Sequence, residues 1–473
     1  MISSPPTASL TDRINRIPVI TTSHRKWAIL VALLLIFEMA DLNAFAYVAP
    51  TLSEQWGLSV DAVAWLSAAA FLGMSAGALV GGYLADKVGR KKLLVYGTLF
   101  YSILSIMSST SSGPVELGVY RFLIGAGLYA VTVAALTYVS EIFPRAHRGR
   151  IQALLMALAF LGIPMMALVS RWLIPMSVDG WRYVFVFGGS GLVIALFAAW
   201  KLPESIRWQE LLGKSDEKTE AIVAEMEADA ERRTGEPLPE PTSEPAVAQG
   251  KASDLVRGGY LKRTVITSVV LVFAVTTFYG FNAWLPYLLG EHGFSQSESL
   301  TYTFIIAIAA CPGALLASVF AERMERRTSV MIACLLAAVL LLVVGTTGSD
   351  TMFLIAGIGV SLLLYFSTAI MYSYMPEIFP TSLRGLGTGI PNSIGRIATM
   401  LAMFAVASIL SDLGFTAVFV FLALSVALSG LILGFFGERT RGRTLESINA
   451  VPSAGRNRDA DAERREGKVA DPA

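Results

Sequence analysis

Hydrophobic residues occur along this chain in long blocks that alternate with short polar segments. A helix needs about 20 apolar residues to cross a bilayer, and twelve blocks are close to that length. They cover residues 27–50, 62–84, 93–111, 114–141, 150–174, 181–202, 261–289, 300–320, 329–347, 351–377, 385–409 and 414–436. The pattern therefore predicts an all-α integral membrane protein with twelve transmembrane helices.

The connecting segments differ in their basic residues, which predicts how the helices are oriented. Lys and Arg gather after the second, fourth and eighth helices, in segments that read ADKVGRKK, FPRAHRGR and AERMERRTS. The alternate segments 51–61, 112–114, 290–299, 348–350 and 410–413 contain neither residue. Because basic loops face the cytoplasm, we expect both termini to be cytoplasmic in a multi-pass protein of a bacterial cytoplasmic (inner) membrane. The polar first 26 residues do not resemble a signal peptide.

The two halves of the chain repeat one another. YVSEIFP at 138–144 recurs as YMPEIFP at 374–380, an offset of 236 residues that also relates Pro50 to Pro286. Duplicated helix bundles are typical of transporters whose halves rock about a site at their interface. The predicted parts are a cytoplasmic N-terminal segment 1–26, six-helix bundles at 27–202 and 261–436, a cytoplasmic linker 203–260 and a cytoplasmic tail 437–473. Within the linker, SDEKTEAIVAEMEADAERR predicts a surface helix, and the Pro-, Glu- and Ser-rich stretch after it predicts a flexible connection.

Composition narrows the class of partner. Hydrophobic residues make up 54% of the chain and charged residues 15%, whereas an average soluble domain has about 25% charged residues. Most of the surface is therefore expected to face the lipid bilayer. The net charge of +1 indicates no nucleic-acid partner. The two cysteines lie in apolar blocks and the three histidines outside them, so no disulfide framework and no metal site is predicted, and no cofactor is expected.

Two carboxylic acids interrupt the first apolar block, which reads FEMADLNAFAYVAP at 37–50. At about 1.5 Å per residue, Glu38 and Asp41 lie roughly 16 and 21 Å from Trp27, near the middle of the bilayer. An ionised acid there costs about 2.5–3.5 kcal/mol, so it must be protonated, paired or facing an aqueous cavity. Spaced three residues apart, the two share one helix face. We predict that Glu38 and Asp41 carry protons; the alternative is that one acid is held in a structural ion pair.

Two arginines also lie within apolar blocks. Arg121 is two turns into the fourth helix, and Arg396 is about 16 Å into the eleventh. An arginine fork suits a carboxylate, either that of Asp41 or that of a substrate. Pro391, with glycines around it at positions 387, 389 and 395, predicts local loosening of the eleventh helix at a binding site.

The chain resembles the major facilitator superfamily at GGYLADKVGRKK (81–92) and RFLIGAG (121–127). PESIRW (203–208) and ERTRGRTLE (438–446) are similar to segments of sugar-porter-like members. The resemblance covers residues 25–448 and implies two pseudo-symmetric six-helix bundles. It also implies a conformational latch formed by Gly82, Asp86, Arg90, Glu141, Arg148, Glu377 and Arg384.

Three further segments are similar to aromatic-acid:proton symporters and niacin-transporter-like members. The symporters carry Asp-Gly-x-Asp in the first helix with a proline nine residues later; Glu38, Asp41 and Pro50 fall on that spacing. Gly-Arg-Ile around Arg396 and Trp-Leu-Pro from Trp284 also match. Together with the buried arginines, these matches lead us to predict substrate-binding roles for Arg121, Tyr279, Asn282, Trp284, Asn392 and Arg396.

These features imply a proton-coupled symporter of a small organic anion, an aromatic or related monocarboxylate, that works as a monomer by alternating access. One alternative is a transporter of a neutral sugar or polyol, but Thr276 and Thr277 replace the paired glutamines of sugar porters. A second is a proton-coupled efflux antiporter, which the single glycine and proline of LGIPMM (161–166) disfavour. A third is a membrane ligand sensor that signals through the linker. No catalytic constellation indicates an enzyme.

Overall fold

The computed structural model describes residues 9–214, 216–241, 254–255, 258–380 and 383–440. Helices account for most of these residues, and none of them lies in a strand. The predicted flexible stretch of the linker lies outside the described residues from 242 to 253, and so do residues 1–8 of the predicted N-terminal segment and 441–473 of the predicted tail.

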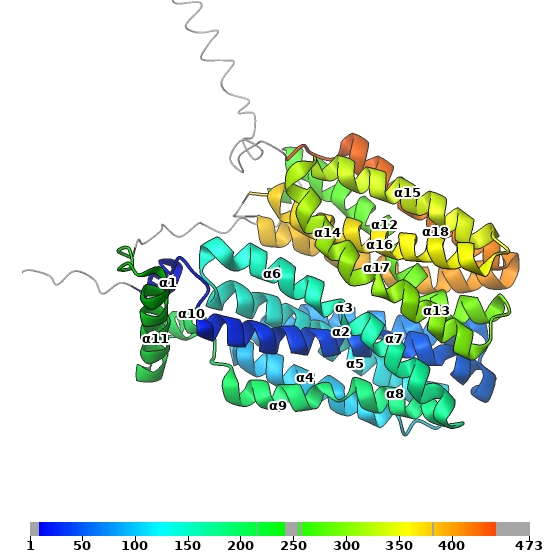
Figure 1. Ribbon diagram of the computed structural model, residues 1–473, viewed down its shortest axis with the longest axis horizontal. Helices are drawn as coiled ribbons and strands as arrows, with labels where there is room; N and C mark the ends of the chain where they lie inside the picture. Colours follow the sequence, from blue (N-terminus) through cyan, green and yellow to red (C-terminus); the bar gives the residue numbers. More distant parts are fainter. Residues whose placement is uncertain (1–8, 215, 242–253, 256–257, 381–382, 441–473) are drawn as a thin grey trace, which may run out of the picture.

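The first half forms one bundle (Figure 1). Its single-helix crossings are α2 (Thr22–Trp56), α3 (Val60–Val88), α4 (Arg90–Ser108) and α5 (Pro114–Ile142). Its other two crossings are each built from two consecutive helices, α6 (Arg145–Ala159) with α7 (Gly162–Leu173), and α8 (Gly180–Gly188) with α9 (Gly191–Lys201).

The second half forms the other bundle (Figure 1). It consists of α12 (Gly258–Glu291), α13 (Gln296–Ile308) with α14 (Ala310–Arg323), α15 (Arg326–Thr346), α16 (Asp350–Glu377), α17 (Arg384–Leu413) and α18 (Phe415–Phe436). α17 runs through Pro391 without a break; because proline has no N–H, one backbone hydrogen bond of the helix is missing there. The predicted fold of two six-helix bundles is confirmed.

Eleven segments of the described chain are long and apolar enough to cross a membrane. The remaining crossing is α4, whose 19 residues start with Arg90, Lys91 and Lys92. These three cations lower the hydropathy of its first turn. α4 nevertheless packs along α5 and α9 within the first bundle, so it takes the place of the third predicted transmembrane helix.

Small residues bring the helices of each bundle into close contact. A Cβ atom added to Gly73 or Gly77 of α3 would collide with the backbone carbonyl of Phe122 or Ala126 of α5, respectively. In the second half, a Cβ atom on Gly313 of α14 would collide with the carbonyl of Leu362 of α16. Since small residues allow helix backbones to approach, these glycines fix the α3–α5 and α14–α16 contacts that flank the interface between the halves.

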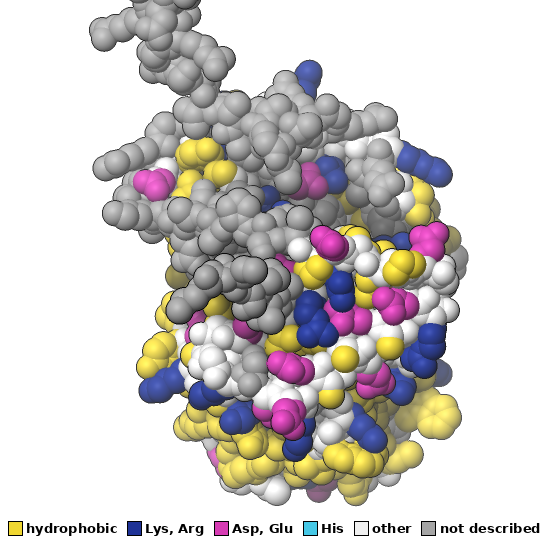
Figure 2. All heavy atoms as spheres, turned by 90° about the vertical axis from the view of Figure 1, so that its left-hand side faces the viewer, with side chains coloured by type: hydrophobic (Ala, Val, Ile, Leu, Met, Phe, Trp, Pro, Cys, Tyr) yellow, Lys and Arg dark blue, Asp and Glu magenta, His cyan; other side chains and the backbone are white. Residues whose placement is uncertain are grey.

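Three short helices lie together at one end of the first bundle: α1 (Leu10–Asn15), α10 (Ile206–Leu211) and α11 (Glu217–Thr234) (Figure 1). We call this end proximal and the opposite end distal. Glu227 of α11 accepts hydrogen bonds from Arg13 and Arg16 at N–O distances of 2.6 and 2.7 Å. Figure 2 faces the proximal end and shows Lys, Arg, Asp and Glu side chains gathered on it. The surface helix predicted in the linker is confirmed as α11.

The two bundles contact each other unevenly. α3 packs along α17, and toward the distal end α7 packs along α13 and α2 contacts α12. Gln296, at the start of α13, donates a hydrogen bond from Nε2 to Oγ1 of Thr51 on α2 at 2.5 Å. Toward the proximal end, α6 and α14 contact each other only sparsely. Among the described residues, the halves are therefore joined more tightly at the distal end.

Candidate substrate and proton sites

The two acids of α2 are buried in the middle of the first bundle. Glu38 and Asp41 are each 1% exposed. The hydroxyl of Thr132 on α5 hydrogen-bonds to Oε1 of Glu38, and the hydroxyl of Ser105 on α4 hydrogen-bonds to Oδ1 of Asp41. Gly188 of α8 leaves the room for this contact, since a Cβ atom there would overlap Oδ1 of Asp41. Each acid is thus held by one hydroxyl group.

The second oxygen of each acid has no hydrogen-bond partner among the described residues. Oε2 of Glu38 and Oδ2 of Asp41 are buried without such a partner, and neither acid forms an ion pair with a described residue. The charge of Arg121 acts on Asp41, and that of Arg396 acts on Glu38, from beyond ion-pair distance. The structural ion pair considered from the sequence is therefore not formed in the described chain.

Arg121 lies on α5 inside the first bundle and is 3% exposed. Its guanidinium carbon is 5.1 Å from the ring centroid of Phe45, which follows Asp41 by one turn of α2. Cations are attracted to the face of aromatic rings. The Nε atom of Arg121 is buried and has no hydrogen-bond acceptor among the described residues. This arginine therefore shares the interior of the first bundle with Asp41.

Arg396 lies on α17 at the contact between the two halves. Its Nη1 donates a hydrogen bond to the Tyr279 hydroxyl of α12 at 3.0 Å. Its guanidinium carbon is 4.4 Å from the ring centroid of Tyr129, which belongs to α5 of the other half. Among the residues that the structure describes, no carboxylate pairs with Arg396. Aromatic side chains from both halves, rather than an acid, hold this cation.

Further aromatic rings extend this arrangement across the interface. The rings pair edge to face, with centroid distances of 4.9 Å for Phe71 and Tyr279, 4.9 Å for Phe278 and Tyr365, and 4.8 Å for Phe160 and Tyr365. Phe71 and Phe160 belong to the first half, and the other three residues to the second. We call these five residues together with Tyr129 the aromatic cluster.

The predicted substrate residues are only partly brought together. Asn282 reaches the aromatic cluster, because it accepts a hydrogen bond from the Tyr365 hydroxyl at 3.3 Å. Trp284 is 1% exposed and packs edge to face on Tyr287. Asn392 donates to the carbonyl of Thr388 in its own helix. Trp284 and Asn392 therefore make their described contacts outside the cluster.

Three residues of this region were not predicted from the sequence: Ser105, Tyr129 and Thr132. Tyr129 and Thr132 follow Arg121 by eight and eleven residues on α5, and this spacing places them on the same helix face. The arginine could therefore have identified both. Ser105 gives no such signal, because its approach to Asp41 depends on how α4 packs against α2.

The predicted latch residues form a separate network within each half at the proximal end. Arg90 pairs with Asp86 at 2.8 Å and with Glu141 at 2.9 Å. In the second half, Arg326 pairs with Glu377 at 2.6 Å. Arg326 was not among the predicted latch residues, although it lies 236 residues after Arg90, at the offset of the internal repeat.

Two of the remaining latch residues bond backbone carbonyls. Arg148 donates to the Phe143 carbonyl at 3.2 Å, and Arg384 donates to the Pro376 carbonyl at 3.0 Å. A Cβ atom on Gly82 would meet no atom within 4 Å. These hydrogen bonds and ion pairs of the latch residues thus join residues of the same half, at the end where the halves are less tightly joined.

Comparison with known proteins agrees with this architecture. The family model of the Major Facilitator Superfamily matches residues 31–376 and 267–457. The chain is 33% identical over 447 residues to a putative metabolite transport protein of Bacillus subtilis, YyaJ, covering 93% of this chain and 98% of that protein. It is 31% identical over 449 residues to the niacin transporter NiaP of Acinetobacter baylyi, covering 93% and 99%.

Another relative is the 4-hydroxybenzoate transporter PcaK of Acinetobacter baylyi, 28% identical over 82% of this chain and 86% of that protein. Among solved structures, the inward-open xylose transporter XylE from E. coli matches with a TM-score of 0.73 over 90% of this chain and 99% of that chain. At 19% identity, this match shows the fold alone. The chain belongs to the major facilitator superfamily, a family of membrane transporters rather than enzymes.

Proposed function

We propose that this transporter carries a small organic anion, an aromatic or related monocarboxylate, together with protons. The observation that carries the proposal is the position of Arg396: a cation at the contact between the halves, held by tyrosines and without a described acidic partner. A substrate at this position touches both halves, as alternating access requires.

A carboxylate is the group that suits Arg396 best. The planar guanidinium presents parallel N–H donors that bind carboxylates in a bidentate manner. The Tyr279 hydroxyl accepts from Arg396, so its own hydrogen is available for a substrate oxygen. Phe71, packed edge to face on Tyr279, offers an aromatic surface beside this position. Since aromatic rings favour such edge and offset contacts, an aromatic body on the carboxylate fits the cluster.

The hydroxyl groups beside the two acids support proton binding. Ser105 Oγ hydrogen-bonds to Asp41 and also lies 3.0 Å from the carbonyl oxygen of Phe185. Thr132 likewise contacts Glu38 and a carbonyl of its own helix. A hydroxyl has one hydrogen to donate, so it cannot bond an ionised carboxylate and the carbonyl at the same time. A protonated carboxyl donates to the hydroxyl, which then donates to the carbonyl, so both contacts of the hydroxyl are hydrogen bonds.

Protonation also couples the acids to the two arginines. When Glu38 is neutral, Arg396 no longer interacts with its charge and is available to a substrate carboxylate. When Asp41 is neutral, the halves move without an ionised acid, whose cost in the membrane is about 2.5–3.5 kcal/mol. Proton binding therefore favours both substrate binding and the conformational change.

The membrane orientation follows from the basic proximal loops, which we assign to the cytoplasm. The tight distal contacts then correspond to an inward-facing state. The relatives named for niacin and 4-hydroxybenzoate transport support an organic acid as cargo. A sugar is disfavoured, since Thr276 and Thr277 direct their hydroxyls to the carbonyls of Val272 and Leu422.

The proposal is tested with full-length protein in liposomes that contain a pH-sensitive dye. Benzoate, 4-hydroxybenzoate, niacin, acetate and xylose are added in turn to the wild type, Asp41→Asn and the exposed-acid control Asp61→Asn. We expect proton entry with an aromatic acid, its loss in Asp41→Asn, and no change in Asp61→Asn. Uptake of xylose or of an acid without proton movement would contradict the proposal. Ligand binding without any uptake would favour a sensor.

A further inference from the structure

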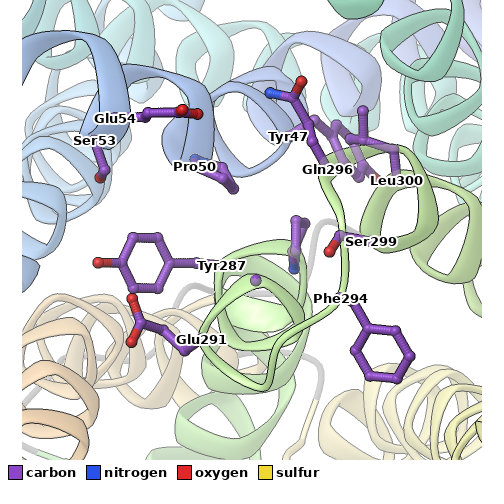
Figure 3. A pocket seen from close by; sticks show the side chains of 12 residues that line it. Tyr47, Pro50, Ser53, Glu54, Tyr287, Glu291, Phe294, Gln296, Ser299 and Leu300 are labelled. Atoms are coloured by element: carbon purple, nitrogen blue, oxygen red, sulfur yellow. The ribbon is translucent and has the colours of Figure 1, made fainter.

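A cavity of about 320 Å³ lies between the two halves at the distal end, away from Arg396. Tyr47 and Glu54 of α2 line it from the first half, and Tyr287, Glu291, Phe294 and Ser299 line it from the second (Figure 3). Pockets that hold small ligands begin at about 300 Å³. The cavity is therefore large enough for a small organic molecule.

The charge of the cavity is negative. Glu54 and Glu291 contribute two carboxylates, one from each half, and no Lys, Arg or His lies among the lining residues. The neighbouring His292 stacks on Phe415 at a centroid distance of 4.3 Å. Glu291 is also the last residue of α12, where the helix dipole adds partial negative charge. Such a site attracts a cation and repels the anion proposed as cargo.

A buried hydroxyl indicates a ligand in addition to the carboxylates. Ser299 is 3% exposed, and its Oγ has no hydrogen-bond partner among the described residues. Figure 3 shows this oxygen directed into the cavity. Buried polar groups are usually paired because an unpaired one costs free energy. A donor on a bound molecule would supply the missing partner.

We propose that this cavity is a binding site for a small organic monocation, a primary ammonium on an aromatic or apolar body. The ammonium has three donors, which suit the carboxylates of Glu54 and Glu291 and the hydroxyl of Ser299. The body packs against the rings of Tyr287 and Phe294. Because both halves line the cavity, the site is complete only when the distal end is closed, and the bound cation holds the transporter in that state.

The probe for the test is phenethylammonium, with the neutral 2-phenylethanol as its matched analogue. Binding is measured by calorimetry on the full-length protein in lipid nanodiscs. Wild type is expected to bind the ammonium at least tenfold more tightly than the alcohol. We expect Glu54→Gln and Glu291→Gln each to weaken binding about tenfold, as a charge-assisted hydrogen bond would, and Ser299→Ala to weaken it about threefold.

Two control variants define the site. Asp61→Asn removes another exposed acid of the α2–α3 region that does not line the cavity, and should leave binding unchanged. Arg396→Ala disrupts the proposed anion site and should also leave it unchanged, so the two proposals fail separately. Equal binding of ammonium and alcohol, no binding at millimolar concentration, or unchanged binding in Glu54→Gln/Glu291→Gln would overturn the proposal. The unfolding temperature without probe confirms that each variant is folded.

Discussion

The first and second halves share their supporting contacts but differ in the chemistry at the membrane centre. Arg90 and Glu141 form an ion pair in the first half, and the residues 236 positions later, Arg326 and Glu377, form one in the second. Tyr129 corresponds by the same offset to Tyr365, and both belong to the aromatic cluster at the interface. The duplicated scaffold thus supplies matching contacts at the proximal end and matching rings at the centre.

The charged residues of the interior break this symmetry. At the same offset, Glu38 and Asp41 correspond to Ala274 and Thr277, Arg121 to Gly357, and Arg396 to Phe160. Among the described residues, the buried acids of the membrane interior therefore lie in the first half, and the arginine that contacts the aromatic cluster lies in the second. Under the proposed function, this difference corresponds to a division of labour, in which protons bind in one half, the anion binds on the other, and Glu38 and Arg396 link the two across the interface.

The largest effect is expected from Arg396→Ala, which removes the proposed anion-binding group from the second half. Hydrogen bonds to charged groups contribute about 1.5–3 kcal/mol each, so losing a bidentate contact should raise the KM for an aromatic acid about 100-fold or more. Arg396→Lys should recover only part of the affinity that Arg396→Ala loses, because lysine lacks the planar guanidinium fork. Radiolabelled uptake measures both, with the exposed Arg171→Ala as control. An unchanged KM in Arg396→Ala would place the anion elsewhere.

Glu38→Gln tests the interaction between the halves, because it replaces the acid of the first half that acts on Arg396 by a permanently neutral amide. The substitution imitates the protonated acid and frees Arg396 from its charge. We expect anion affinity to rise about threefold, a change of roughly 0.6 kcal/mol, and to lose part of its dependence on pH. Equilibrium binding between pH 5 and 8 measures this. Weaker binding at every pH would mean that Glu38 contacts the substrate directly.

These residues were predictable from the sequence to different degrees. Long apolar segments indicate helices that contact lipid, so the positions of the transmembrane helices could be predicted from the sequence. Four charged residues lie within these segments and were therefore easy to recognise: Glu38, Asp41, Arg121 and Arg396. Ser105 did not stand out, since hydroxyl residues are common in helix packing, and Tyr129 is indicated only by its spacing from Arg121. Their roles depend on which helix faces which, and this is set by contacts such as that of Gly188 with Asp41.

The resemblance to relatives was less informative about side-chain placement. Trp284 matches a Trp-Leu-Pro motif, yet its indole packs on Tyr287 of its own helix. A motif carries over a residue type but not its rotamer or its neighbours. In contrast, the internal repeat predicts the ion pair of the second half. Arg90 pairs with Glu141, and the residues 236 positions later, Arg326 and Glu377, form the corresponding pair.

The corresponding ion pairs at the proximal end should differ in strength. Arg90 has a side chain only 8% exposed and also bonds the Ala85 carbonyl, whereas Arg326 and Glu377 are 20% and 29% exposed. Breaking a buried pair costs about 3 kcal/mol, and a more exposed pair about 1 kcal/mol or less. Thermal unfolding should therefore show a larger loss for Arg90→Ala than for Arg326→Ala. The reverse order would contradict this reading of the repeat.

The smallest effect is expected at the contact between α11 and the N-terminal segment, which only the first half possesses among the described residues. Burial opposes the charged form of Glu227, but its hydrogen bonds with Arg13 and Arg16 outweigh burial and lower the pKa of this carboxyl. The ion pair therefore stabilises the contact above the ordinary glutamate pKa of about 4.3. That stabilisation is lost as the pH falls through the lowered pKa.

Glu227→Gln should raise hydrogen exchange in residues 9–16 severalfold at pH 7, and should change transport little. The neighbouring exposed Glu225→Gln is the control. Wild type and Glu227→Gln should become alike once the pH is below the lowered pKa. Identical exchange at pH 7 would show that the contact does not depend on Glu227.

The division of labour is tested most directly by comparing two transport modes in Asp41→Asn. Proton-driven accumulation of an aromatic acid requires release of the proton inside, whereas exchange of labelled for unlabelled acid across liposomes does not. With a permanently neutral group at position 41, accumulation should be lost and exchange should stay within about twofold of wild type, since the anion still binds Arg396. Loss of both modes together, or persistence of both, would contradict the assignment of the proton to the first half.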